Sequence, residues 1–260
     1  MNLASRAHTL SLLVFFAVAA PSALAQQGRS SADFEWSKRL APGSTIAIRT
    51  GLGFIHVSES SSDRVEIRAV KSRRSSNARD VGIDVDETTG RTTICTLYDR
   101  QRSCRERNVS SRGTYVRVDF TVSVPRDVRV DVATGNGEIS VDRAGQSVSA
   151  SSGNGRVFVA TARGPVSVST GNGDVDVRVE SLKSGDDVDV MSGSGLIRVA
   201  VPADFGGELD AQSGNGMLHS DFDVTIFGRM EPGRIRGTIG RGSSRIKLMT
   251  GNGRIEVRKF

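Results

Sequence analysis

Carboxylates at strand spacing are the first residues of this 260-residue chain that could do chemistry. Asp174/Asp176 and Asp187/Asp189 are pairs two residues apart, a spacing that places both side chains on one face of a β-strand. Glycosidases need two carboxyl groups at a defined separation, so the pairs suggest a carbohydrate-active enzyme. Carbohydrate clefts usually gather aromatic side chains, and these are only 5% of the residues. We therefore interpret the four carboxylates as outward-facing, solubilising residues that oppose edge association.

Basic residues are concentrated in two segments. Residues 71–79 carry four positive and no negative charges, and six arginines lie between residues 99 and 117 against two acids. Guanidinium groups bind phosphate and carboxylate through charge-assisted hydrogen bonds, so the second segment is a candidate site for lipopolysaccharide phosphates or acidic glycans. The alternative, which we favour, is a set of solvated loops around a disulfide hairpin. The candidate patch consists of Arg100, Arg102, Arg105 and Arg107.

The first 25 residues are typical of a secretory signal peptide. Arg6 precedes an apolar run of 11 residues, and Ala23-Leu24-Ala25 then predicts cleavage between Ala25 and Gln26. A transmembrane anchor is the alternative, but crossing a bilayer needs about 20 residues, and no later segment is apolar enough to span as a helix. We therefore expect an exported protein of 235 residues (260 − 25) in the periplasm or at the cell surface.

Cys95 and Cys104 are the two cysteines of the chain. Export to an oxidising compartment makes a disulfide the expected state. A metal site or a reactive thiol pair is the alternative, but no histidine lies near the two cysteines to complete a ligand set. The predicted disulfide closes a small loop and contributes about 2–3 kcal/mol in the chain-entropy model.

Seven Gly-x-Gly copies dominate the chain and account for 14 of its 29 glycines. Thr or Ser always precedes the first glycine, and aliphatic residues recur three and five positions before it and four and six after it. Spacing by two predicts strands with one buried face. Each copy is therefore a unit of strand, turn, strand and turn. The copies begin at Gly51, Gly135, Gly153, Gly171, Gly193, Gly214 and Gly251.

Asparagine fills the middle position of most of these turns. A ladder of ligand-binding amides is one interpretation, but we favour turn chemistry, because Asn tolerates left-handed backbone conformations better than most residues. The structural turn residues are predicted to be Gly135, Asn136, Gly137, Gly153, Asn154, Gly155, Gly171, Asn172, Gly173, Gly193, Gly195, Gly214, Asn215, Gly216, Gly251, Asn252 and Gly253.

One such unit is too small to fold alone, so the units must stack and bury each other's faces. The sequence thus predicts an all-β protein, a β-solenoid that we expect to be a right-handed β-helix of short Gly-Asn-Gly coils. Residues 26–41 are predicted to be a linker and 42–125 a less regular N-terminal β part with the disulfide hairpin. The regular repeats follow over 126–260, so that 42–260 form one continuous domain.

The residues that other classes of function would require are absent from the sequence. A calcium-binding repeat needs an acid at a fixed position in successive turns, but Arg156, Leu196, Met217 and Arg254 occupy that position in four copies. Export and the few aromatic residues oppose nucleic-acid binding in spite of the formal net charge of +6. No phosphate-binding loop, dinucleotide fingerprint, nucleophile elbow or zinc motif is present. We therefore expect no catalytic residue, no metal and no cofactor.

The whole layout resembles the DUF4097/DUF4098 "putative adhesin" family of exported bacterial proteins, which is close to DUF2807. The segments that carry the resemblance are PGSTIAIRTGLGFIHV at 42–57, VDFTVSVP at 118–125, VRVDVATGNGEISV at 128–141 and GTIGRGSSRIKLMTGNGRIEV at 237–257. The resemblance implies a β-solenoid and no established catalytic residues. We expect a non-catalytic, adhesin-like module of the envelope or surface, with envelope glycans or other anionic polymers as partners. The alternative is a carbohydrate-active β-helix enzyme acting on acidic polysaccharide.

Overall fold

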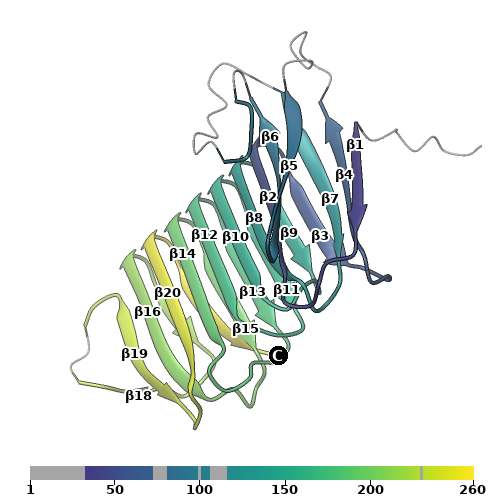
Figure 1. Ribbon diagram of the computed structural model, residues 1–260. Coiled ribbons are helices and arrows are strands. Elements are labelled where there is room, and N and C mark those ends of the chain that lie inside the picture. The colour runs from purple at the N-terminus through teal and green to yellow at the C-terminus, as the bar shows by residue number, and fades with distance from the viewer. Residues whose placement is uncertain (1–32, 73–80, 99–100, 106–115, 229–230) are drawn as a thin grey trace, which may run out of the picture. The chain divides into compact units, whose positions relative to one another are not determined.

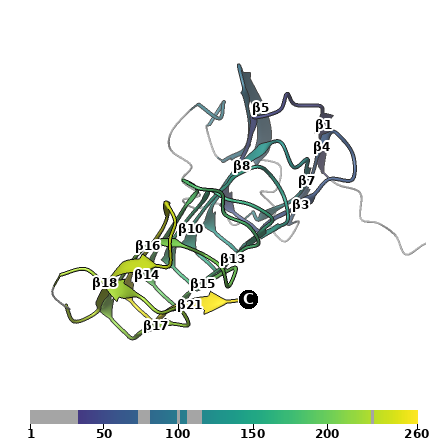
Figure 2. The ribbon, with the colours of Figure 1, turned by 90° about the horizontal axis from the view of Figure 1, so that it is seen from below.

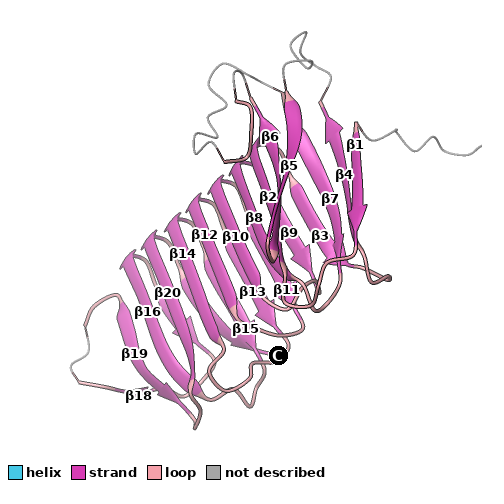
Figure 3. Cartoon of the chain, in the orientation of Figure 1, coloured by secondary structure: helices cyan, strands magenta, loops and turns pink. Residues whose placement is uncertain are grey.

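The computed structural model describes residues 33–72, 81–98, 101–105, 116–228 and 231–260 (Figure 1). The predicted signal peptide with its cleavage site at Ala25 and Gln26 lies outside these ranges, as do Arg100 and Arg107. Over the described ranges the chain forms 21 strands and no helix (Figure 3). The predicted all-β solenoid architecture is thus confirmed. The right hand of the coil stays a prediction.

The strands form two sheets. Sheet A has ten strands in the order β1-β4-β7-β3-β9-β11-β13-β15-β21-β17. Its strands are β1 (Phe34–Lys38), β4 (Val65–Lys71), β7 (Val118–Val124), β3 (Ile55–Glu59), β9 (Ile139–Asp142), β11 (Val157–Thr161), β13 (Val175–Val179), β15 (Ile197–Val201), β21 (Ile255–Lys259) and β17 (Leu218–Ser220).

Sheet B has eleven strands in the order β18-β19-β16-β20-β14-β12-β10-β8-β2-β6-β5. Its strands are β18 (Thr225–Ile226), β19 (Arg234–Ile239), β16 (Gly207–Asn215), β20 (Ser244–Asn252), β14 (Asp187–Ser194), β12 (Val166–Asn172), β10 (Val148–Asn154), β8 (Arg129–Asn136), β2 (Thr45–Leu52), β6 (Arg91–Leu97) and β5 (Gly82–Thr88).

Each Gly-x-Gly copy contributes one strand to sheet B and the next to sheet A. Neighbouring copies pair in parallel and in register, so that Val148 of β10 lies beside Val166 of β12, which lies beside Val188 of β14. Equivalent aliphatic residues therefore form rows along the array, and rows from both sheets belong to one buried cluster. Figure 2 views the two sheets from below. This narrow aliphatic core explains how the chain folds with few aromatic residues.

The two glycines of a copy are needed because neighbouring turns approach closely. A Cβ on Gly153 would lie 2.3 Å from the carbonyl oxygen of Gly135 in the preceding coil, and one on Gly155 would lie 2.0 Å from that of Gly137. Gly155 also has a φ of +151°, a backbone conformation that L side chains rarely adopt. Gly153 and Asn154 end β10, and Gly155 lies between β10 and β11, so the main constraint on both glycines is the contact between coils.

The conformational reason that we gave for the turn asparagines is wrong. Among the described residues, Arg143 is the one residue other than glycine with a positive φ. The asparagines instead form a ladder of side-chain amides: Asn154 Nδ2 donates to Asn136 Oδ1, and Asn172 Nδ2 donates to Asn154 Oδ1, both at 2.9 Å. Asn215 donates to Asn252 in the same way at 2.9 Å. These amides hold neighbouring coils together at the turn edge.

The copies do not stack in chain order. The last copy, which gives β20 and β21, lies between the copy of β14/β15 and the copy of β16/β17 (Figure 1). The chain thus completes the β16/β17 copy first and then returns to fill the space beside β14. Residues 221–241, which break the period of the sequence, contain β18 and the capping strand β19.

Antiparallel strands cover the ends of the parallel array. β5 pairs with β6, β4 with β7, β1 with β4 and β19 with β16, all antiparallel. β1 lies in the segment 26–41 that the sequence predicts to be a linker, so that prediction is wrong for its second half. Phe34 and Trp36 explain the difference, because both pack against the buried core as they pair opposite Ala69 and Ile67.

Candidate functional site

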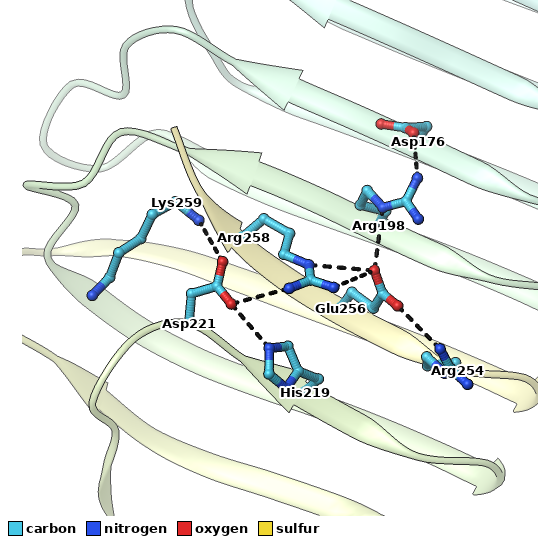
Figure 4. A network of polar contacts seen from close by, with 8 residues as sticks. All are labelled: Asp176, Arg198, His219, Asp221, Arg254, Glu256, Arg258 and Lys259. Atoms are coloured by element: carbon cyan, nitrogen blue, oxygen red, sulfur yellow. Dashed lines mark hydrogen bonds and ion pairs between the residues drawn. The ribbon is translucent and has the colours of Figure 1, made fainter.

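A row of charged side chains crosses sheet A where the last copy is inserted (Figure 4). The parallel register of β13, β15, β21 and β17 aligns Asp176, Arg198, Glu256 and His219. Asp176, Arg198 and Glu256 alternate with buried aliphatic neighbours, so they lie on the outer face of the sheet. We call the following set the charged row: Asp176, Arg198, His219, Asp221, Arg254, Glu256 and Arg258.

Glu256 is at the centre of the charged row, and only 6% of its side chain is exposed. Arg258 Nη2 donates to Glu256 Oε2 at 3.1 Å, Arg198 Nε donates to the same oxygen at 3.2 Å, and Arg254 Nη1 donates to Oε1 at 3.5 Å. Burial alone would raise the pKa of Glu256, but the hydrogen bonds from Arg258 and Arg198 outweigh it and place the pKa below its usual range. The Glu256 carboxylate is therefore held ionised.

Asp221 continues the charged row beyond β17. Its Oδ1 lies 2.9 Å from His219 Nε2 and accepts from Arg258 Nη1 at 3.2 Å, and its Oδ2 accepts from the Lys259 backbone N–H at 3.2 Å. The hydrogen bond with His219 is the main cause that lowers the pKa of Asp221, followed by the one from Lys259. Arg258 thus contacts both acids, and the row ties β21 to the residue that follows β17.

The predicted carboxylate pairs are engaged separately. Asp176 accepts from Arg198 Nη1 at 3.2 Å, whereas Asp174 Oδ1 accepts from the Leu196 backbone N–H at 2.9 Å. In the second pair, Asp187 Oδ2 accepts from Arg245 Nη2 at 2.8 Å. Asp189 Oδ1 is buried without a hydrogen-bond partner among the described residues. Asp187 and Asp189 share a face of β14, whereas Asp174 lies in the turn before β13 and only Asp176 lies on that strand, so the first pair does not share a strand face as predicted.

The structure describes two of the four residues of the predicted arginine patch, Arg102 and Arg105. Arg105 is committed to Asp86, to whose carboxylate it donates from Nη2 at 2.8 Å and from Nε at 3.0 Å. This contact lowers the pKa of Asp86, chiefly through the side-chain hydrogen bond. Arg102 also has an interaction, so neither described member of the patch stands as a free cation. Arg100 and Arg107 lie outside the described residues.

A disulfide joins Cys95 to Cys104, with their Cα atoms 5.6 Å apart, as the sequence predicted. Asp84 lies beside it and accepts from the Cys104 backbone N–H at 3.0 Å. Asp84 and the two sulfur atoms are close enough to suggest a metal site by distance alone. Metal binding requires thiolates, however, and here both sulfur atoms are consumed in the disulfide.

The family of the chain follows from its second half. The model of the family described as Toastrack DUF4097 matches residues 128–258, half of the 260 residues. The chain belongs to the Toastrack DUF4097 family. The matched residues run from just before β8 to the last but one residue of β21, so this Toastrack segment contains every coil of the charged row.

One solved structure shows the same fold at low identity. A "putative cell adhesion protein" from Clostridium sporogenes ATCC 15579 superimposes with a TM-score of 0.50 at 16% identity, covering 87% of this chain and 99% of that chain. A "putative adhesin" from Bacteroides fragilis NCTC 9343 gives a TM-score of 0.32 at 9% identity, covering 86% and 96%. No curated protein matches the chain. The first likeness supports the Toastrack fold over nearly the whole described chain.

Sequence reasoning missed the charged row of this Toastrack chain. Arg198 and Glu256 are 58 residues apart, and they meet only because the last copy inserts beside β15. The one signal that could have revealed the contact is the charge at the third position after the second turn glycine, where Asp176, Arg198 and Glu256 are equivalent. Within the described ranges, no helix reaches the length and hydropathy that crossing a membrane requires.

Proposed function

We propose that this Toastrack chain is a non-catalytic, exported module of the cell envelope or cell surface that binds glycans or other anionic surface polymers. The observation that carries the proposal is the charged row, which presents three arginines and three carboxylates in fixed positions on the outer face of sheet A. Such a surface is fixed in charge and in position, which suits recognition of a partner.

The pKa directions support binding in preference to acid–base catalysis. A glycosidase needs one carboxyl group whose pKa is raised so that it can donate a proton at neutral pH. Among the described residues, each carboxyl pKa that departs from its ordinary value is lowered, and these groups are Asp86, Asp131, Asp221 and Glu256. The array therefore offers ionised carboxylates and arginines, which recognise polar polymers without transforming them.

A surface location agrees with the rest of the chain. The signal sequence predicted for residues 1–25 would export the protein, and the name of the Clostridium sporogenes protein is in keeping with a role in adhesion. Cell fractionation combined with protease treatment of intact cells tests this part. Surface location predicts loss of the protein on protease treatment, and periplasmic location predicts its protection until the outer layer is opened. Recovery in the cytoplasm would contradict export.

The competing function is a carbohydrate-active enzyme acting on acidic polysaccharide, which rests on the spacing of Asp174 and Asp176. Purified mature protein can be incubated with polygalacturonate and assayed in parallel for retention on the immobilised polymer and for release of reducing ends. We expect retention without release. Release of reducing ends by the wild-type protein that disappears in Asp176→Asn would overturn the non-catalytic proposal.

A further inference from the structure

A groove crosses four successive coils of sheet B at the edge where their strands begin. It has a volume of about 370 Å³ and follows the starts of β8, β10, β12 and β14. The groove is lined by Arg129, Gln146, Ser147, Arg163, Gly164, Pro165, Lys183 and Asp186. No motif of the sequence pointed to it, because the lining residues are spread over four turns, none of which contributes more than three.

Positive charge predominates in this groove. Arg129, Arg163 and Lys183 face a single acid, Asp186, so the lining has a formal charge of +2 (3 − 1). Within the part of the chain that the structure describes, none of the three cations has an ion-pair partner. Arginines next to the groove differ in this respect, because Arg143 pairs with Glu180 and Arg245 pairs with Asp187. The groove thus gathers cations that the fold itself does not neutralise.

Asp186, the acid in the lining of the groove, accepts a hydrogen bond from the backbone. Asp186 Oδ2 accepts from the Lys183 N–H at 2.9 Å, and the Asp186 N–H donates to the Lys183 carbonyl at 2.9 Å, so the two residues close one turn. In the neighbouring turn, Thr161 Oγ1 donates to the Arg163 carbonyl at 2.8 Å. These bonds fix the backbone from which Arg163 and Lys183 project, which reduces the ordering cost of binding.

The floor of the groove is also closely packed. Gly164 is buried, and a Cβ at this position would lie 2.7 Å from Leu182 Cδ2 and 3.3 Å from Asp186 Cβ. Glycine therefore lets the turn of Arg163 lie directly against the turn of Lys183 and Asp186. Neighbouring strands of a sheet lie about 4.8 Å apart, so Arg163 and Lys183, which come from adjacent coils, can contact one bound anion together. Arg129 lies on β8, two strands away from the coil of Arg163, at the other end of the groove.

We propose that this groove binds an anionic group, a phosphate or a carboxylate, carried by a glycan chain. Arg163 and Lys183 donate charge-assisted hydrogen bonds to the anion, Arg129 adds a cation at the β8 end of the groove for the same chain, and Gln146 and Ser147 hydrogen-bond the neighbouring sugar hydroxyls. The inference rests on the proposed function and deepens it, since it assigns the anionic polymer to a site. It also moves that site away from the arginines near the disulfide, where Arg105 is already paired with Asp86.

The test compares two triple variants of the mature protein with equal changes in charge. The groove variant is Arg129→Gln, Arg163→Gln and Lys183→Gln. The control variant is Arg39→Gln, Arg105→Gln and Arg126→Gln, which replaces three exposed arginines that pair with Asp63, Asp86 and Glu59. Binding is measured on immobilised polygalacturonate, which presents carboxylates, on poly(glycerol phosphate), which presents phosphates, and on neutral dextran.

We expect the groove variant to bind the preferred anionic polymer about tenfold more weakly or worse, and the control variant to stay within about twofold of the wild type. The polymer that the wild type prefers tells whether the anion is a phosphate or a carboxylate. Equal weakening in both variants, or unchanged binding in the groove variant, would overturn the assignment while the proposed glycan binding still stood.

A second measurement separates the site from the function. Inorganic phosphate is titrated into the wild type while the amide resonances of Arg163 and Lys183 are followed by NMR. Saturable shifts that are absent in the groove variant support the anion site even if neither polymer binds, a result that would contradict the proposed function alone. Absence of both polymer binding and phosphate shifts would overturn both proposals.

Discussion

Arg198 of β15 and Glu256 of β21 face each other across neighbouring parallel strands, with Arg198 Nε donating to Glu256 Oε2 at 3.2 Å, although 58 residues separate them in the chain. Arg198 also donates to Asp176 of β13, so one guanidinium links three successive strands of sheet A. This ion pair joins the inserted copy, through β21, to the neighbouring strand β15. It holds the returning end of the chain in place beside a coil that was completed much earlier.

Replacing Glu256 with Gln should destabilise the fold by about 1–2 kcal/mol, because three arginines then lose their common carboxylate and repel one another. The loss is measured as a lower midpoint of urea unfolding with an unchanged slope. Glu138→Gln is the matched control, since Glu138 is exposed and exposed substitutions of this kind usually change stability by less than about 0.5 kcal/mol. Equal midpoints for the two variants would contradict a stabilising role of the charged row.

Acid should weaken the fold through the carboxylates whose pKa is lowered in the folded protein. The pKa values of Asp131, Asp221 and Glu256 are lowered in the folded protein, whereas unfolded Asp and Glu titrate at about 3.9 and 4.3. Their stabilisation is therefore complete above the unfolded values and is lost as the pH falls through the folded ones. We expect the unfolding free energy to fall steeply below about pH 4 and less steeply in Asp131→Asn. A free energy that is constant from pH 7 to pH 3 would refute this.

The disulfide should contribute to stability independently of the charged row. Replacing Cys95 and Cys104 together with Ala removes a short loop closure, which corresponds to about 2–3 kcal/mol in the chain-entropy model. Thermal unfolding of the wild type with and without a reductant, beside the double variant, measures the effect. The variant should match the reduced wild type and show no further response to reductant. A response of the variant would mean that the reductant acts elsewhere.

The turn glycines offer a test of the contact between coils. Gly155→Ala would place a methyl group 2.0 Å from the Gly137 carbonyl oxygen at a φ of +151°, so we expect a loss of about 3 kcal/mol or more. Gly185→Ala is the control, because Gly185 also has a positive φ, +86°, but nothing lies within 4 Å of its added Cβ. It should cost only about 1–2 kcal/mol. Similar urea midpoints for the two variants would show that φ alone decides the effect.

The repeat pattern predicts the strands and turns well because the residues that specify them are local. The aliphatic residues on each side of Gly153 and Gly155 are enough to place a strand, a turn and the next strand. The sequence does not predict which copies pair, because the strands of all copies have nearly the same hydrogen-bonding edges. The insertion of β20 next to β14 depends on contacts over long sequence separations, such as that of Asp187 with Arg245, and these could not be read from spacing.

Both candidate sites depend on contacts between residues far apart in the sequence, which local patterns do not predict. The charged row depends on the order of the copies, so the sequence shows its acids and arginines without showing that they meet. The groove depends on turns that bring Arg129, Arg163 and Lys183 together although each lies in a different repeat. Local patterns also did not predict β1. This five-residue strand forms because Phe34 and Trp36 pack against the buried core, a contact that the local sequence does not show.

The order of the copies leads to a last prediction, on truncation of the chain. β20 separates β14 from β16, and β21 is the parallel partner of the three-residue strand β17. Removal of residues 243–260 should therefore leave the β16/β17 copy without a parallel partner, while the pairing of β8 to β13 stays intact. Hydrogen exchange measured by mass spectrometry should show loss of protection over Gly207–Asn215 and retained protection over Arg129–Asn136.

Removal of Phe260 alone is the control, since it leaves β20 and β21 complete. Retained protection of Gly207–Asn215 in the long truncation would show that β16 holds its place through β19 alone, and that the inserted copy is not what joins the end of the array to its middle.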